Sequence, residues 1–310
     1  MPKLIDVFKA MFIVAGRAEY LLADVIPYWM GVALASLSFE IILDNASIVG
    51  IGFCIILLIH YATVWINCVY DYEMDKKYKS RLSHAVDMVG RDMLLSFSIL
   101  FILIATLLVT HISMILGRLY LLGLWFTGVI TGQLYSASPL RLKRYIIVGD
   151  LARGYPLICL LLFGYLIITP VIQPSFIAFL IGHIIMLFGA FSIAEIWDWS
   201  DDLEAGIHTI ATIWGFAIAG FLGLMLITVG SFFVIASLCA LLLEKGFTMF
   251  SICLLLLIVT HIIPIYECIL ITRNVDKDYF TTLKPLAQHH QYWLCLWYLS
   301  ELGVLIVLCL

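Results

Sequence analysis

The sequence has little charge: only 12% of its 310 residues are Asp, Glu, Lys or Arg. It also lacks Cys-x-x-Cys pairs and zinc-type spacing, since its eight cysteines fall within or at the ends of apolar segments. We interpret these cysteines as small packing residues and expect no disulfides. No cleavable signal peptide is evident, because Pro2–Glu19 is mixed and amphipathic and the first long apolar run follows it.

Apolar residues dominate instead, at 64% of the chain, with a mean hydropathy of +1.10. A soluble domain of this size cannot bury that much apolar surface, so the sequence predicts an all-α, polytopic membrane protein. Nine segments are expected to cross the bilayer as helices, although the fourth is short. They are Tyr20–Leu43, Ser47–Tyr70, Met93–Leu116, Tyr120–Tyr135, Ile147–Ile168, Phe176–Trp197, Trp214–Leu243, Phe247–Thr272 and Tyr292–Leu310.

Lysines and arginines gather on one side of these nine spans, before the first span and after the second, fourth and eighth. The other side has only Arg118 and Lys245, and Arg153 lies just inside the fifth span. The positive-inside rule then predicts a cytoplasmic N-terminus and cytoplasmic basic loops, with the C-terminus outside. The loop after the sixth span is discordant, because it is acidic with no lysine or arginine.

Two acidic stretches follow the second and sixth spans. Asn67, Asp71 and Asp75 are spaced i, i+4, i+8, and line one face if a helix continues through them. Asp198 and Asp202 are again four residues apart. Their matching positions suggest an internal repeat within one domain, residues 1–310: spans one to four, spans five to eight, and a ninth helix.

Carboxylate and amide oxygens suit Mg²⁺, which usually takes one or two protein carboxylates and leaves other positions to phosphate and water. If the two stretches meet, their acids would repel one another without a cation. Such a site suits a diphosphate bridged by Mg²⁺. The alternative is that both stretches are ordinary solvated helix ends. The matched spacing, on one side of the membrane, favours the metal site.

A basic stretch, Tyr135–Arg144, lies between the two acidic ones. Arg141, Lys143 and Arg144 are either a simple topology signal or a grip on diphosphate oxygens. The same two interpretations apply to Lys77 and Arg81, with the topology signal favoured there.

These stretches together resemble the motifs of the UbiA-type membrane prenyltransferase superfamily. Asn67–Asp75 is similar to its NDxxDxxxD motif, and Asp198–Thr209 to its DxxxDxxAGxxT motif. Tyr135-Ser136 with Pro139–Arg144 resembles a third signature between them. The order, the spacing and the nine-span layout cover essentially the whole chain.

The resemblance implies a helical bundle around a central cavity, with Mg²⁺ and an isoprenyl diphosphate at its cytoplasmic end. By carry-over, Asn67, Asp71, Asp75, Asp198 and Asp202 would hold Mg²⁺. Basic residues such as Lys143 and Arg144 would steady the diphosphate, with Arg141, Lys77, Arg81 and Tyr135 as further candidates. Ionisation of the allylic C–O bond would give a carbocation, which a lipophilic acceptor attacks; aromatic and quinone precursors are the common acceptors. Asp71 and Asp202 would then be catalytic.

Glu195 lies one turn before Asp198 and is a candidate base or acceptor-binding group. Two residues depart from the family pattern and reduce the number of polar groups expected around the metal site. Cys68 stands where aspartate is usual, and Leu203 stands where a basic residue is common.

Aromatic residues crowd both acidic stretches, so a terpene cyclase that folds a prenyl diphosphate on itself is an alternative. A secondary transporter is the alternative from another class. It is disfavoured because transporter sites usually lie near the membrane midplane.

Overall fold

The computed structural model describes residues 3–244 and 250–310, which form helices and no strand. The predicted start of the eighth span, Phe247, and Lys245 lie outside the described residues. The N-terminal half contains α1 (Leu4–Phe8), η1 (Lys9–Val14), η2 (Ala18–Tyr20), α2 (Leu21–Ser36), α3 (Phe39–Asp44), α4 (Ala46–Tyr70), α5 (Tyr72–Tyr78), α6 (Ser80–Val89), α7 (Arg91–Leu116), α8 (Tyr120–Ser136) and η3 (Leu142–Arg144). The remainder contains α9 (Val148–Ile168), α10 (Pro174–Glu204), α11 (Ile210–Trp214), α12 (Phe216–Glu244), α13 (Phe250–Arg273), η4 (Tyr279–Leu283), α14 (Lys284–Gln288) and α15 (His290–Cys309). The all-α prediction is confirmed.

Seven stretches of helix in the described residues are long and apolar enough to cross a bilayer. They are Ala46–Tyr70, Arg91–Leu116, Val148–Ile168, Pro174–Glu204, Phe216–Glu244, Phe250–Arg273 and Tyr279–Cys309. Two predicted spans fall short of that length. The first is divided into α2 and α3, because Leu37 has a left-handed φ of 43° and the Ser38 hydroxyl accepts the Glu40 N–H. The fourth corresponds to α8, which has 17 residues. The count of nine therefore stays a prediction.

The chain forms two compact units. The first comprises Met1–Val32, Ile42–Lys143 and Tyr155–Pro170, and the second comprises Ala33–Ile41, Arg144–Gly154 and Val171–Leu310. The first acidic stretch belongs to the first unit and the second acidic stretch to the second. We describe each unit by itself.

In the first unit, an aromatic cluster anchors the N-terminal segment to α4. Trp65 is fully buried, and its indole N–H donates to the Met11 carbonyl at 2.9 Å. The rings of Phe12 and Phe101 pack on Trp65 with centroids 5.5 and 5.2 Å away. Because Trp65 lies two residues before Asn67, this cluster fixes the end of α4 that carries the first acidic stretch.

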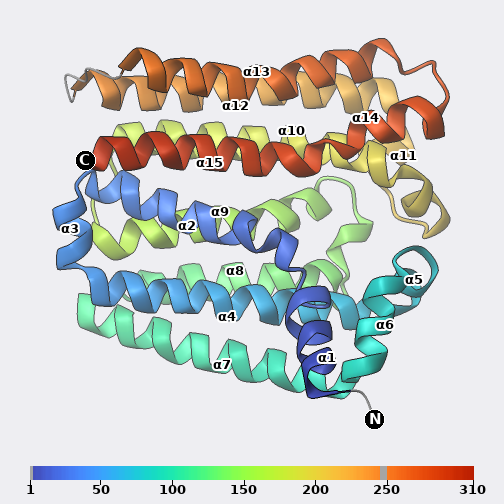
Figure 1. The fold of residues 1–310 in the computed structure, drawn as a ribbon, viewed down its shortest axis with the longest axis horizontal. Coiled ribbons are helices and arrows are strands. Elements are labelled where there is room, and N and C mark those ends of the chain that lie inside the picture. The colour runs from blue at the N-terminus through green and yellow to red at the C-terminus, as the bar shows by residue number, and fades with distance from the viewer. Residues whose placement is uncertain (1–2, 245–249) are drawn as a thin grey trace. The chain divides into compact units, whose positions relative to one another are not determined.

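In the second unit, α10 packs closely against α12, which in turn packs against α13 (Figure 1). A Cβ atom on Gly189 would lie only 2.9 Å from the backbone nitrogen of Ile227. Gly182 faces Gly230 in the same way, seven residues earlier on α10. Small residues at this seam let the two backbones approach, which is how membrane helices gain packing energy.

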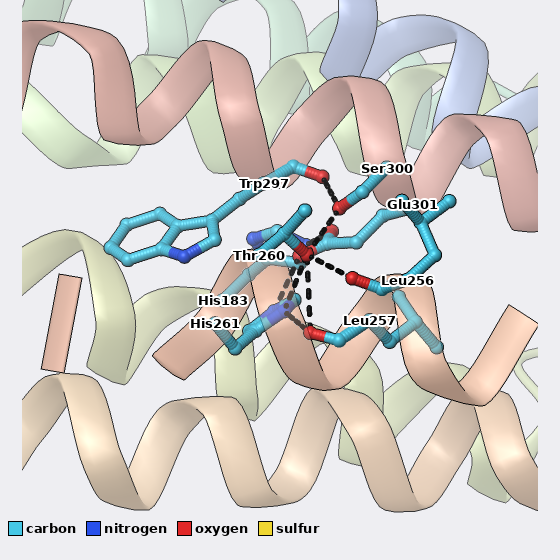
Figure 2. Close-up of polar contacts among 8 residues, drawn as sticks. All are labelled: His183, Leu256, Leu257, Thr260, His261, Trp297, Ser300 and Glu301. Atoms are coloured by element: carbon cyan, nitrogen blue, oxygen red, sulfur yellow. Dashed lines mark hydrogen bonds and ion pairs between the residues drawn. The ribbon is translucent and has the colours of Figure 1, made fainter. Parts of the chain in front are cut away.

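A buried polar cluster also joins α10, α13 and α15 (Figure 2). The Glu301 carboxylate is fully buried, 2.6 Å from His183 Nε2 and 3.1 Å from His261 Nε2. His261 Nδ1 lies 2.8 Å from the Leu257 carbonyl, to which it can only donate. Through these contacts Glu301 on α15 links His183 on α10 to His261 on α13.

Candidate active site

The first acidic stretch lies where α4 passes into α5. The helix is interrupted at Asp71, which has φ −94° and ψ 5°, so the expectation of one continuous helix is not met. The i to i+4 hydrogen bonds nevertheless continue across the break, from Asp71 N to Asn67 O at 2.9 Å and from Asp75 N to Asp71 O at 2.8 Å. Asn67, Asp71 and Asp75 therefore keep the spacing predicted from the sequence.

Two cations from the stretch after α8 converge on Asp71. Asp71 Oδ1 lies 2.6 Å from Lys143 Nζ and 2.9 Å from Arg141 Nη2. The side chains of Asp71 and Lys143 are only 9% and 8% exposed, so this ion pair is largely shielded from solvent. A third cation, Arg17, has its Nη2 atom 3.9 Å from Asp75 Oδ2. The first unit thus gathers three cationic side chains around two carboxylates.

Burial shifts the pKa values of Asp75 and Lys143 toward the neutral forms, and the neighbouring opposite charges oppose these shifts. Burial raises the pKa of Asp75, while the neighbouring Arg17 guanidinium opposes that shift. Burial likewise lowers the pKa of Lys143, and Asp71 opposes that shift. Shifted groups of this kind, with a named charge partner, are typical of functional sites.

Several polar atoms of the cluster have no hydrogen-bond partner among the described residues although they are buried. Four of the nine such atoms belong to the first acidic stretch and to the two arginines that pair with it; they are Arg17 Nε, Asn67 Oδ1, Asp75 Oδ2 and Arg141 Nε. Buried polar atoms are normally satisfied, so four unsatisfied atoms in one cluster indicate a site that binds something polar.

Two of the cations also have strained backbones. Arg17 and Arg141 have left-handed φ values of 42° and 43°. Such conformations cost on the order of 1–3 kcal/mol each in residues other than glycine, and they tend to collect at functional sites. This strain places both guanidinium groups beside the carboxylates.

The donor set of the cluster fits Mg²⁺. Asn67 Oδ1 and Asp75 Oδ2 are buried acceptors without a hydrogen-bond partner in the described chain, and Asp71, four residues from each, supplies a further carboxylate. Among the residues described, no three His, Cys, Asp or Glu side chains surround one point. Two carboxylates and an amide leave coordination positions for phosphate and water, as Mg²⁺ prefers.

An apolar cavity lies in the same unit and contains about 630 Å³ of empty space, part of it open. Its walls come from α2, α4, α8 and α9. Thr63, Gly132 and Pro156 are among the residues that line it. The Thr63 hydroxyl accepts from Gln133 Nε2 at 3.1 Å, and Thr63 is one turn before Asn67 on α4. The cavity therefore approaches the acidic stretch.

The second acidic stretch lies on α10 in the second unit, where Asp198 and Asp202 share one continuous helix and are both half-buried. Glu195 is buried one turn earlier, and its Oε2 accepts the Ala211 N–H at 3.3 Å. Its carboxyl group also contacts that of Asp150 on α9. Two carboxyl groups in contact are an arrangement that can carry out general acid–base chemistry.

Four further residues are predicted from the sequence to bind the diphosphate. Arg144 belongs to the second unit and is exposed, as are Lys77 and Arg81 in the first unit. Lys77 packs over the Tyr78 ring at 5.1 Å. Tyr135 is half-buried near the end of α8.

The sequence assigns no site role to Asp150, which lies within the fifth predicted span, although a carboxylate in a predicted span is itself a signal of function. It makes Arg17, which precedes the first span by three residues, only a weaker candidate for phosphate binding. Its contact with Asp75 joins positions 58 residues apart, which no local pattern indicates.

Comparison with solved structures gives similarity over nearly the whole chain. A UbiA homologue from Archaeoglobus fulgidus bound to GPP and Mg²⁺ has a TM-score of 0.68 at 15% identity, covering 97% of this chain and 99% of that one. The same homologue bound to DMAPP and Mg²⁺ gives 0.65 at 15% identity, with 96% and 99% covered. A digeranylgeranylglyceryl phosphate synthase gives 0.69 at 15% identity, with 98% and 99% covered. A search of curated protein sequences gives no match.

The long apolar helices indicate an integral membrane protein, and the similarities show that its helical fold is shared with these solved structures. The model of the UbiA prenyltransferase family matches residues 25–280, which is most of the chain. The chain therefore belongs to the UbiA prenyltransferase family.

Proposed function

We propose that this protein is a Mg²⁺-dependent prenyltransferase that moves an isoprenyl group from an isoprenyl diphosphate to a lipophilic acceptor. The observation that carries the proposal is the Asp71–Arg141–Lys143 cluster beside an apolar cavity in the first unit. Solved relatives that bind GPP or DMAPP with Mg²⁺ support the choice of substrate and metal.

The charge of the cluster supports binding of a diphosphate. Three cations contact the two carboxylates, and Lys79 also acts on Asp75 through its charge, so the cluster has a net positive charge. A diphosphate would draw Arg141 and Lys143 away from Asp71, arginine by paired hydrogen bonds and lysine as a point charge. Asp71 would then be free to act as a metal ligand with Asn67 and Asp75.

When bound, Mg²⁺ would stabilise the negative charge that builds on the leaving diphosphate. The guanidinium of Arg141 and the ammonium of Lys143 would act on the same charge from the protein side. The apolar lining of the cavity would keep water away from the allylic cation. That Asp198 and Asp202 complete the metal site, and that Arg144, Lys77, Arg81 or Tyr135 bind the diphosphate, stays a prediction from the sequence.

Glu195 and Asp150 are the proposed proton-handling pair. The acceptor loses a proton when the new bond forms, and a carboxylate of this pair can take it up. The charge of Asp202 also acts on Glu195.

The test is diphosphate release by purified protein supplied with geranyl diphosphate, Mg²⁺ and a panel of lipophilic acceptors, with products identified by mass spectrometry. We expect turnover that requires an acceptor and stops with a chelator. Asp71→Asn should lower the rate at least 100-fold. Glu73→Gln is the matched control, because Glu73 is an exposed carboxylate two residues away that pairs with Arg91. Full activity of Asp71→Asn would overturn the proposal.

The same reaction without acceptor separates transfer from cyclisation. Release of a cyclic hydrocarbon or alcohol from the diphosphate alone would identify a terpene cyclase of this family.

The proposed orientation has a cytoplasmic N-terminus and an external C-terminus. It is tested by a C-terminal alkaline phosphatase fusion, which is active only outside the cytoplasm.

A further inference from the structure

An aspartate and a histidine form a polar pair on the wall of the apolar cavity in the first unit. Asp24 of α2 and His60 of α4 both line the cavity. Asp24 Oδ2 lies 2.6 Å from His60 Nδ1, and His60 Nε2 lies 3.0 Å from the Gly16 carbonyl. The His60 side chain is fully buried, whereas that of Asp24 is 27% exposed.

These contacts fix the hydrogen-bonding role of each atom. A carbonyl oxygen only accepts, so His60 Nε2 carries a proton and donates it to Gly16. A single further proton lies between Nδ1 and Oδ2, which makes the pair neutral as a whole whichever atom holds it. Both ring nitrogens are then occupied. The pair uses only Oδ2 of Asp24, so Oδ1 is left as an acceptor for a ligand in the cavity.

The rest of the lining is almost entirely apolar. Besides Asp24 and His60, two lining side chains carry oxygen or nitrogen, and both already have partners. The Thr63 hydroxyl accepts from Gln133, and the Trp125 indole N–H donates to the Thr106 hydroxyl at 3.0 Å. Ile55 and Phe163 are among the apolar lining residues. A ligand that fits this cavity is therefore a lipophile with one hydrogen-bond donor.

The cavity wall on α4 continues toward the first acidic stretch. His60 and Asn67 are seven residues apart, which places them within about 20° on the helix face and about 10 Å apart along its axis. Thr63 lies between them on the same side. A molecule anchored at Asp24 thus lies on the side of α4 that leads to Asn67.

We propose that Asp24, held by His60, is the hydrogen-bond anchor for a hydroxyl group on an otherwise apolar substrate. On the proposed prenyltransferase function, on which this assignment rests, that substrate is the acceptor, a lipophilic phenol or alcohol. The isoprenyl chain of the donor has no hydroxyl group and would leave Oδ1 unused. A quinone carbonyl is also excluded as the anchored group, because both ring nitrogens of His60 are already engaged and Asp24 Oδ1 can only accept.

The test measures binding with probes that differ only in the donor group. Tritiated farnesol is bound to the purified full-length protein in detergent, without Mg²⁺ or diphosphate, and displaced by farnesol, farnesyl methyl ether or farnesal. We expect farnesol to bind about ten-fold more tightly than the ether or the aldehyde. Equal binding of all three to the wild-type protein would overturn the proposal.

Three variants test whether the Asp24–His60 pair causes the preference for farnesol. Asp24→Leu should bind farnesol as weakly as the ether, with ether binding unchanged as the sign of an intact cavity. Asp24→Asn should keep the preference, because its amide N–H can donate to His60 Nδ1 and its oxygen can accept from the ligand. Gly132→Leu should weaken all three probes, since a Cβ at Gly132 meets only Pro156, at 3.4 Å, and a longer side chain there fills the cavity.

Asp44→Asn, which removes an exposed carboxylate, is the control and should behave as wild type. A ten-fold preference that survives Asp24→Leu would contradict the assignment. These measurements need no turnover, so their outcome is independent of whether the protein has the proposed transferase activity. A protein that prefers farnesol but transfers no prenyl group contradicts the function alone, and active transfer without a hydroxyl preference contradicts this inference alone.

Discussion

Replacing Asp71 should lower both the stability and the activity of this protein. A second substitution at Lys143 should restore the stability but not the activity. Asp71 is the counter-ion of Lys143, whose side chain is 8% exposed. The Asp71→Asn variant leaves that ammonium buried beside Arg141 with no carboxylate in contact. The double variant Asp71→Asn/Lys143→Met removes both members of the pair.

The size of the stability effect follows from burial. Breaking a buried ion pair by removing one partner costs about 3–5 kcal/mol, whereas removing both partners is often nearly neutral. The side chain of Arg141 is 25% exposed and its charge is partly hydrated, so we expect about 3 kcal/mol for Asp71→Asn. This corresponds to a fall in Tm of about 5–10 °C. The double variant should melt close to wild type.

Intrinsic fluorescence during a thermal ramp measures the Tm values, and diphosphate release measures activity on the same samples. Both variants should lose at least 100-fold in rate, because metal and diphosphate contacts are missing in each. An unchanged Tm for Asp71→Asn would show that Lys143 does not depend on Asp71 in solution. An active double variant would refute the role of the cluster in the reaction.

Three further predictions concern other parts of the molecule. Arg17→Gln should raise KM for the prenyl diphosphate about ten-fold in steady-state kinetics, because it removes one of the three cations near the carboxylates; an unchanged KM would exclude Arg17 from diphosphate binding. Mg²⁺ alone should shift Tm by less than about 1 °C, and Mg²⁺ with diphosphate by several degrees, because the ligand-free site is already positive in net charge; an equal shift by the metal alone would contradict this charge balance. Glu301→Ala should cost about 2–4 kcal/mol by chemical denaturation, through lost hydrogen bonds to His183 and His261 and an unfilled space, with the rate per folded molecule unchanged.

The helices and the motifs could be read from the sequence because they depend on local spacing. Apolar runs of sufficient length indicate membrane helices, and the spacing of Asn67, Asp71 and Asp75 survives the break at Asp71 through the i to i+4 hydrogen bonds. The first predicted span was too long, because a left-handed backbone at Leu37 ends α2 in an otherwise apolar run. Nothing in the hydropathy of that run marks the break.

The partners of the buried charges depend instead on how helices pack. From the sequence, Arg141 and Lys143 were as consistent with a topology signal as with a site, since no local pattern shows that they contact Asp71 seventy residues earlier. The pairs Asp24–His60 and Asp150–Glu195 join different helices in the same way.

The sequence by itself determined the class of protein, the positions of most helices and the residue types available for metal and diphosphate binding. Only the tertiary structure decided which charges neutralise one another and which polar atoms remain open. The physical reason is that hydropathy and helical period act over a few residues. The rotation of each helix about its axis, which aims a side chain at its partner, is set by packing across the whole unit.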